Sequence, residues 1–152
     1  MTESLGMIVK LIDHFGFLCE DYALDLTSYH FDRKSFGNIN AVFENKEMAL
    51  RFTLEKGQLF IHASPLAYPE EWYSLLKLVK YIARKGGTLS AEEQNTDYWR
   101  NGQQLESQYA LAVGQLHRIL GTVINMLGSR ELETTRLDLR SFVRPTPSPS
   151  QP

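Results

Sequence analysis

The first stretch of the chain places an apolar residue every three or four positions. The stripe runs over residues 3–20 and consists of Leu5, Ile8, Val9, Ile12, Phe15 and Cys19. Side chains at this spacing lie on one face of a helix. Thr2 is a candidate N-cap, and Glu3 suits the positive end of a helix dipole. The pattern therefore predicts a helix over residues 3–20.

Apolar and polar residues then alternate, which is typical of half-buried strands. The alternating runs are residues 22–31, 38–44, 48–55 and 59–64. In the first run the apolar residues change parity between Leu26 and Tyr29, and a bulge at Thr27–Ser28 would restore a single apolar face. The four runs predict a mostly antiparallel meander, since short polar links join the last three.

The hairpin links decide which residues face one another across these strands. If residues 45–46 and 56–57 each form a two-residue link, Asn40 faces Arg51, and Arg51 faces His62. Every apolar residue of the three strands then meets an apolar partner. That agreement supports this register.

In this register Asn40, Arg51 and His62 form one row on the polar face of the sheet, with Thr53 and Phe60 beside them. A guanidinium fork, an amide and an imidazole together are typical of a small anion- or partner-recognition patch. A solvated row of long polar side chains would give the same pattern. The row contains no obvious nucleophile, which favours binding over catalysis.

Helical spacing returns in the second half of the chain. Residues 69–85 begin with a proline followed by two glutamates, and they carry one wide apolar face that includes Trp72. A longer helix is predicted over residues 90–127, with a break near residues 101–102. Apolar residues at heptad spacing form a seam over residues 105–126. We expect this seam to pack inside its own domain, and pairing with a second copy to form a homodimer is the alternative.

The last residues complete the predicted organisation. Residues 136–143 alternate again and predict a weak edge strand, whereas residues 144–152 have the composition of a disordered, polyproline-like tail. We therefore expect a single α+β domain over residues 1–128 and a C-terminal extension over residues 129–143. The fold class is a four-stranded, mostly antiparallel sheet with one N-terminal and two C-terminal helices packed on it.

Composition narrows the functional classes. The chain of 152 residues has a formal net charge of −2, which lacks the basic footprint of a nucleic-acid binder. Residues 1–75 hold 11 acidic and 6 basic side chains, a mild acidic excess that slightly favours a basic partner. Cys19 is the only cysteine, which we expect to be a small buried residue in a reducing cytoplasm. No signal peptide or membrane span is expected, so the predicted location is cytoplasmic.

Motifs that carry chemistry are missing from the sequence. It contains no zinc-protease, CxxC, P-loop, dinucleotide-binding or nucleophile-elbow motif, and no two histidines are four residues apart. We therefore nominate no catalytic residue, metal or cofactor. Trp99 and Arg100 form an aromatic–arginine pair in a polar stretch, a composition typical of interface hot spots. A helix junction would account for the pair equally well.

One resemblance adds to this reading. It rests on a leading helix followed by Phe36-Gly37-Asn38, Arg51, Gly57-Gln58 and Pro69-Glu70-Glu71-Trp72. This arrangement, over residues 5–127, resembles small uncharacterised bacterial α+β proteins, some of which are immunity proteins of polymorphic or contact-dependent toxin systems. The resemblance implies that the protein binds and neutralises a cognate toxin without chemistry.

We therefore expect a non-enzymatic, cytoplasmic protein-binding protein. One alternative is a small-ligand-binding protein or enzyme that uses the open sheet face around Asn40, Arg51 and His62. The other is a structural protein that self-associates through its long helix.

Overall fold

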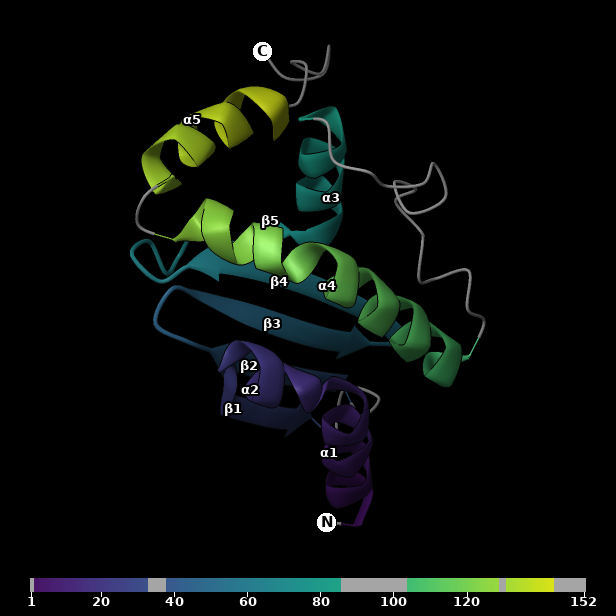
Figure 1. The fold of residues 1–152 in the computed structure, drawn as a ribbon. Coiled ribbons are helices and arrows are strands. Elements are labelled where there is room, and N and C mark those ends of the chain that lie inside the picture. The colour runs from purple at the N-terminus through teal and green to yellow at the C-terminus, as the bar shows by residue number, and fades with distance from the viewer. Residues whose placement is uncertain (1, 33–37, 86–103, 129–130, 144–152) are drawn as a thin grey trace, which may run out of the picture.

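The computed structural model describes residues 2–32, 38–85, 104–128 and 131–143. Its elements follow the order α1 (Thr2–Phe15), α2 (Phe17–Tyr22), β1 (Asp25–Asp32), β2 (Asn38–Glu44), β3 (Met48–Glu55), β4 (Gln58–Pro65), β5 (Tyr73–Ser74), α3 (Leu75–Arg84), α4 (Leu105–Leu127) and α5 (Leu132–Val143). Figure 1 shows one open sheet with the helices on one face and beyond one edge. The α+β class is therefore confirmed.

The sheet is an antiparallel meander with the strand order β1-β2-β3-β4-β5. Its first four strands are those that the alternation predicts. The fifth, Tyr73–Ser74, pairs with Ala63 and His62 at the end of the sheet. A strand of two residues is too short to produce a recognisable alternation, so this segment was assigned to the following helix.

The predicted bulge in β1 is confirmed. The register between β1 and β2 shifts between Leu26 and Ser28. Leu26 and Tyr29 thereby both pack against the core, although they are three positions apart and would lie on opposite faces of a regular strand. The bulge therefore lets one strand present a single apolar face despite the change of parity in its sequence.

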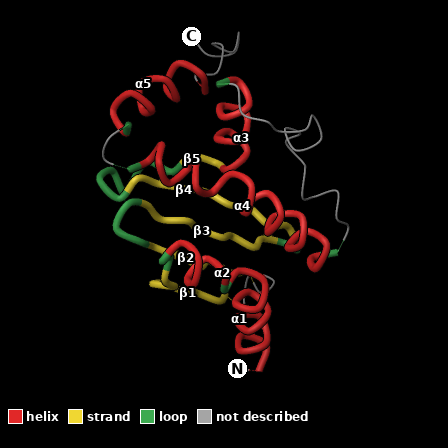
Figure 2. Tube along the Cα trace, viewed as in Figure 1, coloured by secondary structure: helices red, strands yellow, loops and turns green. Residues whose placement is uncertain are grey.

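One face of the sheet forms the core together with the helices. Buried residues alternate along its central strands: Ile39, Ala41, Phe43, Leu50, Phe52, Leu54, Leu59, Ile61 and Ala63. Helix α4 lies across this face, where Figure 2 shows it in front of β3 and β4. Tyr109, Leu116 and Val123 of the predicted seam are buried there, so the seam packs inside the chain. We call this the inner face, and the opposite one the outer face.

The N-terminal helix is divided in two at Gly16. The Gly16 N–H donates to the Ile12 carbonyl oxygen at 2.7 Å, and a Cβ placed on Gly16 would lie 2.7 Å from that same oxygen. A residue without a side chain is therefore required where α1 passes into α2. The apolar spacing predicted one continuous helix over residues 3–20 and not this division.

The buried stripe of these two helices matches the predicted one only in part. Phe15 is buried as expected, together with Leu11 and Leu18, whereas Val9 and Ile12 are 53% and 46% exposed. Cys19 is also exposed, contrary to its expected burial. The apolar residues cover more than one face of the helix, and the spacing alone did not indicate which face meets the sheet.

Helix α3 begins six residues later than predicted, at Leu75. The Ser74 side chain caps it by accepting a hydrogen bond from the Lys77 N–H at 3.2 Å. Trp72 therefore lies in the connection before the helix and is only half-buried, rather than on the apolar face of the helix. The predicted helix start at the proline was wrong because a better cap follows it.

Residues 132–143 form helix α5 and not the expected edge strand. Leu132, Thr135 and Leu139 are buried at helical spacing, while Leu137 is 64% exposed. Leu137 and Leu139 had suggested alternation, yet they point to different sides of a helix. Helix α5 contacts both α3 and α4, so this extension packs on the rest of the fold.

Candidate functional site

The outer face carries the predicted row in a different register. Arg51 faces His62 across β3 and β4, as predicted. Asn40, however, faces Thr53, because Glu44 pairs with Ala49 and four residues form the link between them. Asn40 is therefore displaced by two residues along the strand from the position opposite Arg51. It remains on the outer face, because a shift of two preserves the side to which a residue points.

Two rows of side chains result. Val42, Arg51, His62 and Ser74 lie side by side across β2–β5, and Asn40, Thr53 and Phe60 form the adjacent row. The Thr53 hydroxyl donates to the Asn40 amide oxygen at 3.1 Å. The predicted residues of these strands thus share one face, but they do not converge as a single row of Asn40, Arg51 and His62.

Arg51 is the most unusual residue of this face. Its guanidinium carbon lies 4.4 Å from the centre of the Trp72 ring. Its Nε is fully shielded from solvent, yet within the described part of the chain this atom has no hydrogen-bond partner. No ion pair joins Arg51 to a carboxylate of the described residues. A partly buried guanidinium usually has an oxygen partner, so Arg51 has hydrogen-bonding capacity that the described residues do not meet.

His62 lies beside Arg51 and is half-buried. Its Nδ1 is shielded from solvent and has no hydrogen-bond partner among the described residues. Burial lowers the pKa of His62 from its usual value, and the positive charges of Arg51 and Lys77 lower it further. The imidazole is therefore mainly neutral at pH 7.

The end of the outer face near β1 carries carboxylates in place of a guanidinium. A shallow cavity of about 190 Å³ is lined by His30, Asp32, Asn38, Ile39, Asn40, Thr53 and Glu55. Pockets for small organic ligands usually exceed about 300 Å³. This volume gives little support to the alternative of a small-ligand site at Asn40.

The remaining predicted site residues are less informative. Phe60 is half-buried on the outer face, in the row of Asn40 and Thr53. Trp99 and Arg100 lie outside the described residues. The outer-face site is therefore defined by Arg51, His62 and Trp72, with Thr53 and Phe60 at its border.

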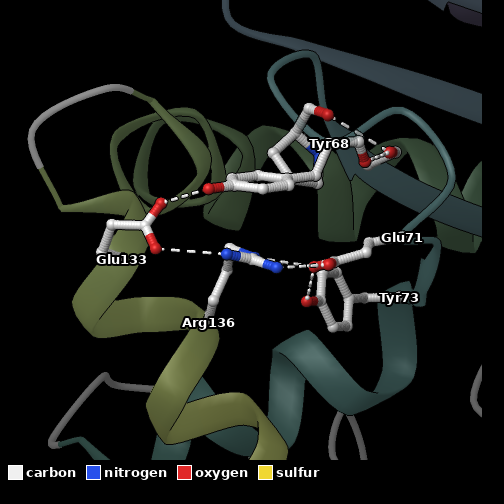
Figure 3. Close-up of polar contacts among 7 residues, drawn as sticks. Tyr68, Glu71, Tyr73, Glu133 and Arg136 are labelled. Atoms are coloured by element: carbon white, nitrogen blue, oxygen red, sulfur yellow. Dashed lines mark hydrogen bonds and ion pairs between the residues drawn. The ribbon is translucent and has the colours of Figure 1, made fainter.

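A second cluster was missed entirely. Figure 3 shows Arg136 of α5 between two carboxylates and beneath the ring of Tyr68. Its Nε donates to Glu71 at 2.8 Å, and its Nη1 donates to Glu133 at 3.1 Å. The Tyr68 hydroxyl donates to Glu133 at 2.7 Å. This arrangement joins α5 to the connection between β4 and β5.

The charges of this cluster are mutually satisfied. Hydrogen bonds from Arg136 lower the pKa of Glu71 to about 2, and a hydrogen bond from Tyr73 adds to the effect. Burial and the bond to Glu71 raise the pKa of Tyr73 to about 12. Glu71 and Arg136 are separated by 65 residues, so no local pattern could indicate their pairing. We regard the cluster as a structural clamp.

A larger cavity lies away from the outer face, between α3, α4 and α5. It encloses about 660 Å³ and includes Tyr81, Lys85, Thr122, Asn125 and Asp138 in its lining. The Tyr81 hydroxyl donates to Asp138 at 2.8 Å, and the Lys85 ammonium lies 3.0 Å from the same carboxylate. These groups already pair with one another. The cavity has the size of a ligand pocket, but its Lys85 and Asp138 side chains already form an ion pair.

No group of three or more His, Cys, Asp or Glu side chains among the described residues is arranged to hold a metal ion. A hydrogen bond from the Cys19 thiol to Asp25 raises the pKa of Cys19, as does its partial desolvation. A raised pKa keeps the thiol protonated, which disfavours a nucleophilic role.

Among the described elements, α4 is long and apolar enough to cross a membrane by length and composition alone. Buried residues such as Ala112 and Leu116 place it in the protein core, which requires the same composition. The helix therefore does not decide the location of the protein.

Comparison with known proteins identifies no relative: no family model, curated protein or solved structure matches the chain. Neither the immunity-protein resemblance nor any other family assignment gains support from this comparison.

Proposed function

We propose that the protein binds a partner protein through the outer face of its sheet and performs no chemistry on it. The observation that carries this proposal is Arg51, a half-buried guanidinium stacked on Trp72 and without an acceptor among the described residues. Tryptophan and arginine are the residues most enriched at the energetic centres of protein interfaces. Half-buried Val42 and Phe60 nearby add apolar area.

The opposite faces of the sheet support the same view. The inner face is covered by helices, whereas the described helices leave the outer face uncovered (Figure 1). An antiparallel sheet commonly has one solvated face, so exposure alone is no sign of function. Here the exposed face also carries an unpaired charge and an aromatic ring, which a purely solvated face does not need.

The more specific form of the proposal is an immunity protein that neutralises a cognate toxin in the bacterial cytoplasm. It rests on the resemblance of the sequence to immunity proteins, and the outer face would then be the surface that covers the toxin. A toxin that is inactivated by stoichiometric amounts of the purified protein would establish it.

A photocrosslinking amino acid at position 53, expressed in the native host, tests the general proposal. The matched control carries the same amino acid at position 137, which is exposed on α5. We expect one protein to crosslink stoichiometrically at position 53 but not at position 137. The crosslink at position 53 should disappear in the Arg51→Gln variant. The same yield at both positions, or no crosslinked protein at position 53, contradicts the proposal.

A further inference from the structure

We propose that Arg51, together with Trp72 and His62, binds a single carboxylate of the partner, supplied by an acidic side chain or by a free C-terminus. This inference rests on the proposed function and identifies the chemical group that the outer face recognises. It makes the centre of the outer face a carboxylate site, although the chain as a whole is slightly acidic.

The first step is the unmet hydrogen-bonding capacity of Arg51. A guanidinium has five N–H donors and no acceptor, and it stays charged at any physiological pH. In the described part of the chain, Arg51 contacts the Trp72 ring, and this contact satisfies none of its N–H groups. An aromatic ring supports a cation but does not replace an oxygen acceptor. An anion with two oxygens would satisfy the donors that the fold leaves open.

The second step is the geometry of the contact with Trp72. The ring lies 4.4 Å from the guanidinium carbon and covers part of the group. Hydrogen bonds from a guanidinium lie in its own plane, and contact with one ring on one side of the group leaves donors on its other side for a ligand. A carboxylate approaching in the plane accepts two parallel hydrogen bonds, which is the preferred geometry of arginine–carboxylate pairs. The contact with Trp72 thus restrains the position of the fork.

The third step is the electrostatic surroundings. His62 faces Arg51 from β4, and Lys77 contributes positive charge from the first turn of α3. The other neighbours in the row, Val42 and Ser74, carry no charge. The local potential is therefore positive, and a bound anion would favour the protonated imidazole. Because its Nδ1 is shielded from solvent, His62 then supports the bound anion through its charge.

The charge at the site also favours a carboxylate over a phosphate group. One arginine and one more distant lysine match a single negative charge. Phosphate recognition generally uses clusters of arginines or a helix N-terminus. Asp32 and Glu55 at the other end of the outer face would repel a dianion further.

The test is an NMR titration of the ¹⁵N-labelled full chain, observed at the Arg51 Nε–H and at the His62 ring. The probes are acetyl-tetraglutamate amide, its neutral match acetyl-tetraglutamine amide, acetyl-tetraglutamine with a free C-terminus, and inorganic phosphate. We expect saturable shifts at Arg51 with one or both carboxylate probes and none with the neutral peptide. Which of the two binds distinguishes a side chain from a C-terminus as the source. Bound carboxylate should also raise the pKa of His62.

Variants separate recognition from folding. Arg51→Gln should weaken binding of the carboxylate peptide by about tenfold or more, because the paired donors are lost. Arg140→Gln removes an exposed arginine of α5 and should leave binding unchanged. The backbone spectra of both variants must match that of the unmodified protein. His62→Gln should retain binding but lose its strengthening below pH 6.5.

The inference is overturned if neither carboxylate probe shifts Arg51, if the neutral peptide shifts it equally, or if phosphate binds more tightly. These results are distinguishable from failure of the proposed function. Crosslinking at position 53 would persist if the outer face binds its partner through contacts other than a carboxylate.

Discussion

Among the described residues, two arginines lie over aromatic rings, and they differ in their carboxylate partners. Arg136 lies 3.4 Å from the Tyr68 ring centre and bonds to Glu71 and Glu133. Arg51 lies 4.4 Å from the Trp72 ring centre and has no carboxylate among the described residues. The same residue type on the same kind of support is therefore structural in one place and unsatisfied in the other. The difference indicates which of the two is available for a partner.

The largest expected effect is on the satisfied arginine. Arg136→Gln removes charge-assisted bonds from a side chain that is 12% exposed, and it leaves Glu71 partly buried without its cation. We expect the free energy of unfolding to fall by about 2–3 kcal/mol in urea denaturation. Arg140→Gln, at an exposed arginine of the same helix whose charge is the smallest of the influences on Glu71, should change it by less than about 0.5 kcal/mol. Equal effects of the two substitutions would show that the clamp contributes little.

The clamp should also respond to acid. The pKa of Glu71 is about 2, below the ordinary value of 4.5, so its contribution is complete above pH 4.5 and is lost as the pH falls towards 2. The carboxylate is 30% exposed, so solvent screening limits the contribution to about 2 kcal/mol. The stability difference between the unmodified protein and Glu71→Gln should shrink between pH 5 and pH 2. A difference independent of pH would contradict this assignment.

The sequence predicted one register of the sheet and not the other, for a local reason. Lys56 and Gly57 have φ angles of 51° and 76°, as a two-residue hairpin turn requires, and glycine is a clear signal of such a turn. At the preceding link, the Asn45 side chain accepts hydrogen bonds from the N–H groups of Glu47 and Met48. That longer turn shifts Asn40 by two residues, and a lone asparagine does not specify it.

The sequence likewise predicted only part of the site correctly. The pairing of Arg51 with His62 followed from the correct hairpin. Trp72 was expected in the core, because its spacing fits a helix that in fact starts at Leu75. The clamp joins residues far apart in the chain, so only the folded structure reveals Arg136 as its centre. Local signals predict local geometry, whereas satisfaction of buried charges is decided by tertiary contacts.

The unsatisfied arginine should respond to substitution with the opposite sign. Arg51→Met retains an aliphatic stem against Trp72 and removes a charge that has no acceptor in the described structure. We expect the free energy of unfolding to stay the same or to rise by up to about 1 kcal/mol. Crosslinking of the partner protein at position 53 should be lost in the Arg51→Met variant. A stability loss as large as that of Arg136→Gln would show that Arg51 is structural, and the comparison would fail.

The smallest effect concerns the neighbour of the unsatisfied arginine. Burial and the charges of Arg51 and Lys77 lower the pKa of His62 in the folded chain, so the unfolded chain binds a proton more readily. Stability should therefore decrease as the pH falls below about 6.5, the usual pKa of an unfolded histidine. His62→Gln should remove that part of the decrease, and Arg51→Met should reduce it because one repelling charge is gone. Urea denaturation between pH 7.5 and pH 5.5 measures the free energy of unfolding of the unmodified protein and of both variants. If Arg51→Met leaves the pH dependence unaltered, the two side chains are not electrostatically coupled and a carboxylate bound at Arg51 would not recruit His62.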